Sequence, residues 1–235
     1  VHSHYIRASD FTRIHIQDLQ FLFRTYDEQF CGGLVQQVLE GRHLTFRLSQ
    51  RMTRTGGTTT RSLNAKTGEV NYQIAIAVGL LFDGFRETDR RITVSGLECG
   101  SRLEALQRIF EHEIVHLMEF LCWESSECAA GRFQDIARRL FLHRAHTHHL
   151  VTRRERAAYA GIQPGSRVAF VFEGHQIVGR VNRVTRRATV LVEDATGRTY
   201  SDGRRYKVYY VPIASLVPVV VDLPDIQLRN HASQR

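Results

Sequence analysis

The sequence predicts an α+β protein in two parts, with helices and strands in the first part and a small all-β barrel in the second. Two observations lead to this class. Apolar residues recur every three or four positions in several segments before residue 160, whereas residues 161–221 hold short alternating stretches separated by turn sequences. We therefore divide the chain into a first domain at 1–160, a barrel at 161–221 and a tail at 222–235.

Strand and helix signals alternate through the first domain. A strand pattern follows each of two glycine-containing turns, and the longest helical pattern comes after all three strands. Ser125-Ser126 predicts the cap of a last helix carrying Phe133 and Leu140 on its apolar face. The expected elements are a helix at Asp18–Phe30 ending at Gly32-Gly33, strands at His43–Ser49, after Gly57 and at Tyr72–Ile76, and a helix at Ser101–Leu121.

The pattern changes after Tyr159. A break at Gly161–Gly165 is followed by five short strand patterns with turns between them, which is typical of a small closed or half-open barrel. The expected strands are Arg167–Phe172, Gln176–Val184, Ala188–Glu193, Tyr206–Val211 and Leu216–Val221.

Composition limits the possible classes of protein. Of the 235 residues 43% are hydrophobic, which is enough for a core and excludes wholesale disorder. The formal net charge is +8, and every basic residue except Lys66 and Lys207 is an arginine. This surplus permits a polyanionic partner such as nucleic acid without requiring one.

The cellular location of the protein is predicted from segments that the sequence does not contain. No apolar run approaches the ~20 residues of a membrane helix, and the first residues hold no apolar segment of secretory type. The four cysteines form no Cys-x-x-Cys pair, which indicates reduced thiols rather than a zinc ribbon or a disulfide framework. We expect a cytoplasmic protein with no membrane partner.

Two histidines and a glutamate stand together inside the longest predicted helix, as His112-Glu113-Ile114-Val115-His116. Histidines four residues apart lie on one face of a helix, so both imidazoles can reach one metal ion. Glu113 is placed to take a proton from a metal-activated water. The pattern predicts a Zn²⁺ site in a hydrolase, against the alternative of two surface histidines beside an unrelated glutamate.

The third zinc ligand is left open by the sequence. Cys128, twelve residues beyond His116 where the chain turns back, is our first candidate, and the alternative for it is a buried free thiol. His143, in the histidine-rich stretch 143–149, is our second, and the alternative there is a solvated cluster. Glu119 lies too far along the helix from His112 to share its ion, so we expect it to form a supporting contact or a salt bridge.

Four segments follow one another along the first domain in a characteristic order, namely Tyr26–Phe30 with Gly33-Leu34, Leu48–Met52 with Gly56, Leu106–His116, and Arg132-Phe133. Through these segments, residues from about Asp18 to Leu150 resemble the SprT-like (Spartan-type) metallopeptidase domain. The resemblance implies a zinc-dependent endopeptidase with a zincin-like α+β fold of helices and a small antiparallel sheet. The best-known members of that family digest proteins crosslinked to DNA.

The chain departs from this family in two places. The family's third ligand is a histidine four residues before the phenylalanine that matches Phe133, and Ala129 stands at that position here. The site is therefore either completed by the neighbouring Cys128 or impaired. The family's frequent C-terminal zinc ribbon is replaced by the predicted barrel.

Basic and aromatic side chains mix in the predicted barrel. Residues 161–219 hold nine Lys and Arg against four Asp and Glu. Such small barrels often bind nucleic-acid backbones or stack bases, and this one is somewhat similar to KOW or Tudor-type modules. The alternative is a scaffolding barrel with solvated arginines. The candidate nucleic-acid-binding residues are Arg183, Arg186, Arg187, Arg204 and Arg205.

These observations predict a zinc-dependent endopeptidase acting on proteins, with DNA-associated or DNA-crosslinked proteins as candidate substrates. In it, Glu113 is catalytic and His112, His116 and Cys128 bind the metal. An alternative of another class is a catalytically impaired nucleic-acid- or protein-binding adaptor with a vestigial or structural metal site. A weaker alternative is a metal-dependent hydrolase of other substrates.

Overall fold

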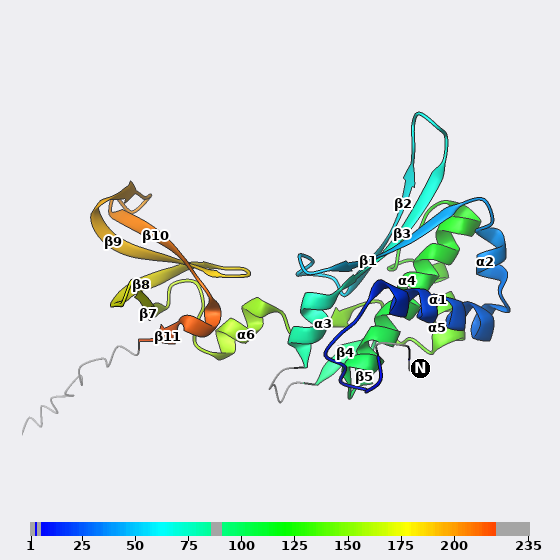
Figure 1. The fold of residues 1–235 in the computed structure, drawn as a ribbon, viewed down its shortest axis with the longest axis horizontal. Coiled ribbons are helices and arrows are strands. Elements are labelled where there is room, and N and C mark those ends of the chain that lie inside the picture. Colours follow the sequence, from blue (N-terminus) through cyan, green and yellow to red (C-terminus); the bar gives the residue numbers. More distant parts are fainter. Residues whose placement is uncertain (1–2, 4–5, 86–90, 220–235) are drawn as a thin grey trace, which may run out of the picture. The chain divides into compact units, whose positions relative to one another are not determined.

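The computed structural model describes residue 3, residues 6–85 and residues 91–219, and it separates into two compact units, Val1–Thr152 and Arg153–Arg235 (Figure 1). The division lies between Thr152 and Arg153 instead of at the predicted 160/161. The reason is the short helix α6 (Arg153–Tyr159), whose Ala157 is fully buried in the core of the second unit. The predicted tail at 222–235 lies outside the described residues.

The first unit mixes helices and strands, as the α+β prediction requires. Its expected helices and strands are all present within a few residues of their predicted bounds. In chain order the elements are α1 (Ile16–Cys31), α2 (Leu34–Val38), β1 (His43–Ser49), β2 (Gly57–Leu63), β3 (Val70–Ala77), α3 (Val78–Gly84), β4 (Ile92–Val94), β5 (Leu97–Cys99), α4 (Arg102–Trp123), α5 (Gly131–Phe141) and β6 (His148–His149).

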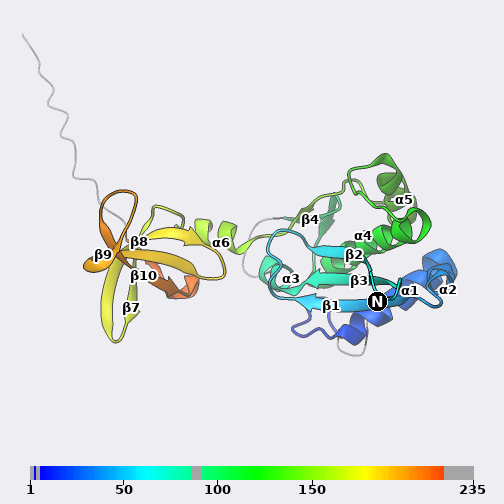
Figure 2. The ribbon, with the colours of Figure 1, turned by 90° about the horizontal axis from the view of Figure 1, so that it is seen from above.

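The main sheet of this unit has the order β1-β3-β2, so β3 is the central strand and β2 an edge strand (Figure 2). β2 and β3 form an antiparallel hairpin, with Thr59 opposite Ile74. β1 runs parallel to β3, with His43 opposite Asn71, so this sheet is mixed, whereas the resemblance implies an antiparallel one. Alternating residues indicate that a segment is a strand, but they do not indicate which neighbour it pairs with or in which direction.

A second small sheet has the order β5-β4-β6 and is antiparallel. β6 consists of two residues from the histidine-rich stretch, and His148 lies opposite Val94 of β4. This pairing fixes the end of the histidine-rich stretch against the body of the unit.

Helix α4 is the central helix of the first unit. The Ser101 hydroxyl accepts a hydrogen bond from the Glu104 backbone N–H at 3.3 Å and so caps its start. The apolar stripe of α4 packs into one core with α1, β3 and α5, to which Phe110 and Leu117 contribute fully buried side chains. The part of α4 that carries the His112–His116 motif is buried as well, since Glu113 is only 2% exposed.

Helix α5 begins later than Ser125-Ser126 predicted. Its N-cap is Ala130, which makes no side-chain capping bond, so the predicted serine cap is wrong. The hydroxyl of Ser126 is instead bonded to side chains of α4. The helix ends at Leu142, a non-glycine residue in the left-handed conformation (φ 59°), which turns the chain sharply.

The second unit is a five-stranded antiparallel sheet with the order β10-β9-β8-β7-β11. Strands β10 and β11 lie at its two edges, and no ladder joins them among residues 153–219, so this sheet is not a closed barrel. β9 runs on to Thr199 beyond the predicted Glu193. The bounds are β7 (Arg167–Phe172), β8 (His175–Val184), β9 (Ala188–Thr199), β10 (Arg205–Val211) and β11 (Val217–Pro218), with a 3₁₀ turn at Ile213–Ser215.

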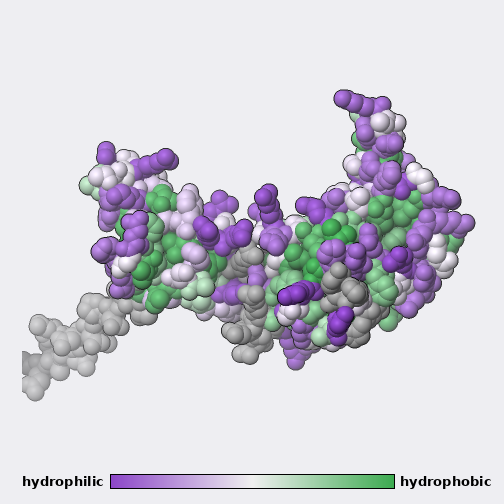
Figure 3. Space-filling model, viewed as in Figure 1, coloured by the Kyte–Doolittle hydropathy of each residue, from purple (hydrophilic) through white to green (hydrophobic). Residues whose placement is uncertain are grey.

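This sheet encloses a separate hydrophobic core, to which Val168, Phe170, Val181 and Val190 contribute. Apolar side chains also lie on its outside, since Val171 is 71% exposed. The space-filling view accordingly shows hydrophobic residues over the strands of this unit, with hydrophilic residues around them (Figure 3). Part of the last predicted strand, residues 220–221, lies outside the described residues.

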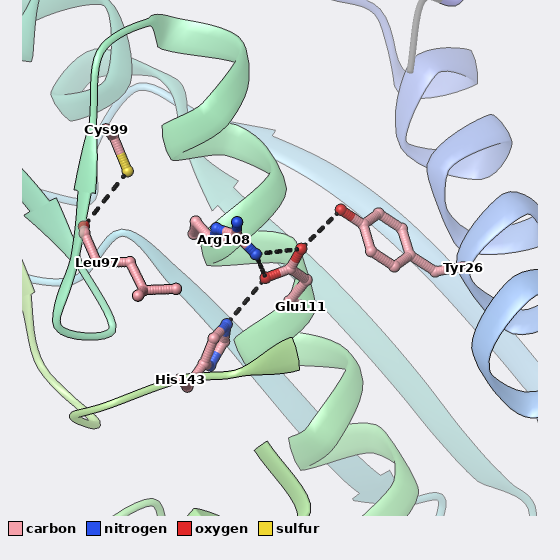
Figure 4. Close-up of polar contacts among 6 residues, drawn as sticks. All are labelled: Tyr26, Leu97, Cys99, Arg108, Glu111 and His143. Carbon is pink, nitrogen blue, oxygen red and sulfur yellow. Dashed lines mark hydrogen bonds and ion pairs between the residues drawn. The ribbon is translucent and has the colours of Figure 1, made fainter. Parts of the chain in front are cut away.

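A buried polar cluster joins α1, α4 and the segment after α5 in the first unit (Figure 4). The Glu111 carboxylate accepts hydrogen bonds from the Tyr26 hydroxyl (2.9 Å) and from Arg108 (3.0 and 3.2 Å), and it lies 2.9 Å from His143 Nε2. Burial, followed by the adjacent Glu111 charge, raises the pKa of Tyr26 well above its ordinary value, so the tyrosine is a permanent donor.

We expect Tyr26→Phe to lower the free energy of unfolding by about 1–3 kcal/mol, because it removes a hydrogen bond to a buried carboxylate and keeps the ring. Tyr72→Phe is the matched control, since Tyr72 is equally buried but its hydroxyl has only a marginal 3.5 Å contact with Arg42. Urea unfolding of both variants measures the difference. Equal losses in the two would contradict a special role for the cluster.

Candidate metal centre

The imidazoles of His112 and His116 meet on one face of α4. Their Nε2 atoms are 3.1 Å apart, and their ring centroids are separated by 4.9 Å. The Phe133 ring of α5 packs against both, at 4.7 and 4.5 Å between centroids. Two ring nitrogens from consecutive turns are thus directed at the same point, as the spacing of the motif predicts.

A chain of hydrogen bonds fixes the orientation of His116. Its Nδ1 lies 2.6 Å from the Ser126 hydroxyl, which donates to Glu119 Oε2 at 2.6 Å. Because the serine proton is used toward Glu119, His116 Nδ1 is the donor in its own contact, and its Nε2 carries a free lone pair. Arg132 Nε donates to the other Glu119 oxygen at 2.6 Å. The salt bridge expected for Glu119 is therefore present, with Arg132 as its partner.

Cys128 lies beside the two histidines, in the turn between α4 and α5. Its Sγ and one ring nitrogen of each of His112 and His116 all lie within 4.8 Å of one another. Burial raises the pKa of the thiol, which disfavours the thiolate unless a cation is bound. The structure therefore brings together the three residues we expected to bind the metal.

A second group of three shares His112 with the first. It consists of His112, Glu113 and His148, whose donor atoms also lie within 4.8 Å of one another. The rings of His112 and His148 are 4.6 Å apart between centroids. Our sequence analysis missed His148 because it singled out His143 from the same stretch. The sequence signal was present, since the stretch supplies several imidazoles, but only the pairing of β6 with β4 selects His148.

His143 does not reach the metal centre, so our second choice for the third ligand is wrong. The left-handed turn at Leu142 ends α5 before His143 and directs its side chain to Glu111. Ala129, the position that matches the family's histidine, offers no donor side chain.

Two residues of the edge strand β2 lie against Glu113. The Thr59 hydroxyl lies 2.8 Å from Glu113 Oε2 and 2.9 Å from the Glu113 backbone carbonyl. A Cβ on Gly57 would lie 2.7 Å from Glu113 Oε1, so only glycine leaves room for the carboxyl group there. Burial raises the pKa of Glu113 to about 8, although the Thr59 contact opposes the shift. Sequence analysis missed both β2 residues.

The donor set suits a zinc ion. Burial is the main cause that lowers the pKa of His112 to about 2, and those of His116 and His148 to about 4, so all three imidazoles are neutral at pH 7. Neutral imidazoles and a cysteine are ligands that Zn²⁺ prefers.

The candidate nucleic-acid-binding arginines all lie in the second unit and fall into two groups. Arg186 and Arg187 are exposed in the turn between β8 and β9, and Arg183 is exposed on β8. Arg204 forms an ion pair with Glu193 at 3.0 Å, and Arg205 donates to the Ala195 carbonyl at 3.2 Å. Arg183, Arg186 and Arg187 are thus exposed and make no ion pair with another described residue, so they can meet an external anion.

Comparison with known proteins gives no match among protein-family models, curated proteins or solved structures. Within the described residues, no helix combines the length and the apolar character needed to cross a membrane.

Cys128 and Cys122 provide a matched pair of substitutions. We expect Cys128→Ala to weaken zinc retention at least about tenfold in competition with a chelator, because a direct ligand is lost. Cys122→Ala should leave retention unchanged, since that thiol is exposed. If both variants retain zinc as the unsubstituted chain does, Cys128 is not a ligand.

Proposed function

We propose that this chain is a zinc-dependent endopeptidase, with His112, His116 and Cys128 holding the metal and Glu113 acting as the general base. One observation carries the proposal. A fully desolvated carboxyl group stands one residue from an imidazole whose Nε2 is 3.1 Å from that of a second histidine. Burying any of these polar groups alone costs free energy. Together, two imidazoles that can bind a metal ion and a carboxyl group that can take a proton are what metal-assisted hydrolysis requires.

Glu113 has the chemical properties of a proton carrier. Burial raises its pKa to about 8, and the charge of a bound dication would lower that pKa again, toward pH 7. The Thr59 hydroxyl orients one of its oxygens, and Gly57 leaves space around the other. A zinc ion held by the histidines would supply Lewis-acid polarisation of a carbonyl and of a water molecule. Glu113 would take the proton of that water and return it to the leaving amine.

The position of β2 favours a peptide as substrate. β2 is an edge strand, and two of its residues, Gly57 and Thr59, contact Glu113. An extended peptide can add to such an edge through main-chain hydrogen bonds, which would bring its carbonyl groups close to the general base. A small-molecule hydrolase has no need of this arrangement.

The substrate class follows from the resemblance to SprT-like domains and from the basic second unit. The resemblance and the basic charge both favour, as substrates, proteins associated with or crosslinked to DNA. The exposed arginines of the β8–β9 turn would bind the DNA that carries these proteins. This chain would then take part in the repair of DNA–protein crosslinks.

A second candidate function is supported by Ala129. Since this position lacks the histidine of the SprT-like pattern, a chain that binds zinc but does not cleave would act as a nucleic-acid- or protein-binding adaptor. Absence of cleavage by the full chain on protein substrates, with and without DNA, favours this function over the first.

Glu113→Gln tests the general base. We expect this variant to keep about one zinc per chain, because Glu113 is not a ligand in the proposed set, and to lose at least about a hundredfold in peptide cleavage. Glu40→Gln, an exposed glutamate of the same unit, is the control and should behave as the unsubstituted chain. Cleavage that survives in Glu113→Gln would rule out its role as the base.

Arg186→Ala/Arg187→Ala tests the basic turn. We expect weaker binding to duplex DNA and a salt dependence reduced by up to about two units of slope, because up to two phosphate contacts are lost. Arg204→Ala is the control, since Arg204 is already paired with Glu193. A salt dependence unaltered in the double variant would argue against this surface.

A further inference from the structure

We infer that the second unit binds unpaired nucleic acid in a groove on the outer face of its sheet, which is the face opposite its core. The inference rests on the nucleic-acid partner in the proposed function, and it adds which form of nucleic acid is bound and where. It concerns a different surface from the exposed β8–β9 turn, and it does not depend on peptide cleavage.

The groove is built on outward-facing positions of strands β7, β8 and β9. Val168 and Val181 are buried in the core of this unit, so the adjacent Arg167 and Arg180 lie on the opposite face of the sheet. Arg167 lies opposite Arg180 in the β7–β8 ladder, and Arg180 lies opposite Leu191 in the β8–β9 ladder. These three side chains line a pocket of about 560 Å³, which is within the size range of ordinary ligand pockets.

Arg167 and Arg180 place like charges directly opposite each other. Both are exposed, and neither makes an ion pair with another residue in the described part of the unit, 153–219. Like charges in this position on neighbouring strands destabilise a sheet. One phosphate group between the two guanidinium groups would remove the repulsion, because guanidinium matches phosphate oxygens in charge and geometry.

The two acidic residues that line the same pocket already have other partners. Glu193 forms an ion pair with Arg204 at 3.0 Å. Asp202 accepts hydrogen bonds from the Tyr206 hydroxyl at 2.7 Å and from the Arg204 backbone N–H at 3.1 Å. Neither acid pairs with the two opposed arginines, so these arginines remain available to a phosphate.

Apolar and aromatic side chains beside the arginines favour an unpaired strand over a duplex. Val178 is 41% exposed, and it lines the pocket together with Leu191 and Tyr206. The Tyr206 ring is held by its bond to Asp202 and by an edge contact with Tyr200, at 5.3 Å between centroids. A duplex keeps its base faces stacked inside, whereas an unpaired strand can stack its bases on aromatic side chains. The pocket therefore matches one phosphate of an unpaired strand and a neighbouring base.

Binding of the full chain to a fluorescently labelled oligothymidylate tests the groove, and about 12 nucleotides suffice because small β modules cover about 4–16. We expect Arg167→Ala/Arg180→Ala to bind this strand at least about tenfold more weakly, because two phosphate-binding side chains are lost. Arg186→Ala/Arg187→Ala removes the same charge from the turn and is the control. It should bind the oligothymidylate within about threefold of the unsubstituted chain while losing affinity for duplex DNA. Oligothymidylate binding that is unchanged in Arg167→Ala/Arg180→Ala would overturn the inference.

Substitutions with opposite effects on stability and binding separate a binding role from a structural one. Arg180→Glu places an acid opposite Arg167, so we expect oligothymidylate binding to fall at least about tenfold while the free energy of unfolding does not fall. For the stacking ring, we expect Tyr206→Leu to weaken binding about tenfold and Tyr206→Phe to bind within about twofold of the unsubstituted chain. Binding that falls only in variants that also lose stability would contradict the inference.

The binding measurements contain no protein substrate, so loss of peptide cleavage leaves the inference intact. A chain whose turn arginines bind duplex DNA, but whose groove variants bind oligothymidylate normally, refutes the groove alone. A chain that binds neither form of DNA refutes the groove together with the nucleic-acid partner of the proposed function. A phosphoserine peptide that binds this groove more tightly than the oligothymidylate would make a modified protein the occupant and overturn the inference.

Discussion

The close approach of two imidazoles on α4 is the constraint on which the rest of the first unit depends. Their Nε2 atoms are 3.1 Å apart in a largely buried environment, which two neutral rings tolerate only with support around them. Phe133 packs on both rings, and Ser126 and Glu119 orient one of them. The edge strand β2 closes the other side around Glu113. Helix α5, the turn before it and strand β2 thus each contribute at least one contact to this part of α4.

The elements of the fold could largely be predicted, because periodicity is a local property. The strand at His43–Ser49 and the helix ending at Gly32 have the expected bounds, and Gly32 adopts the left-handed conformation (φ 61°) that such an end requires. Pairing is not local. The parallel contact of β1 with β3, and the assignment of α6 to the second unit, depend on which surfaces pack together.

The difference between local pattern and long-range packing also decides which residues of the candidate site could be predicted. His112, Glu113 and His116 stand within one helical turn, so their spacing alone placed them on one face. Cys128 was placed by its position after the turn of the chain. Thr59 and Gly57 come from β2 and His148 from β6, and nothing in their local sequence shows that these strands meet α4. Ser126 looked like a helix cap, because serine bonds equally well to a backbone N–H or to a nearby carboxylate.

The second unit combines a small hydrophobic core with an exposed basic turn. In the proposed function, the first unit would supply the chemistry through one ion held between His112 and His116. Anomalous diffraction at the zinc edge from crystals of the full chain measures this most directly. We expect one strong peak about 2.0–2.1 Å from both Nε2 atoms. A zinc-loaded crystal with no peak between these two histidines would contradict it.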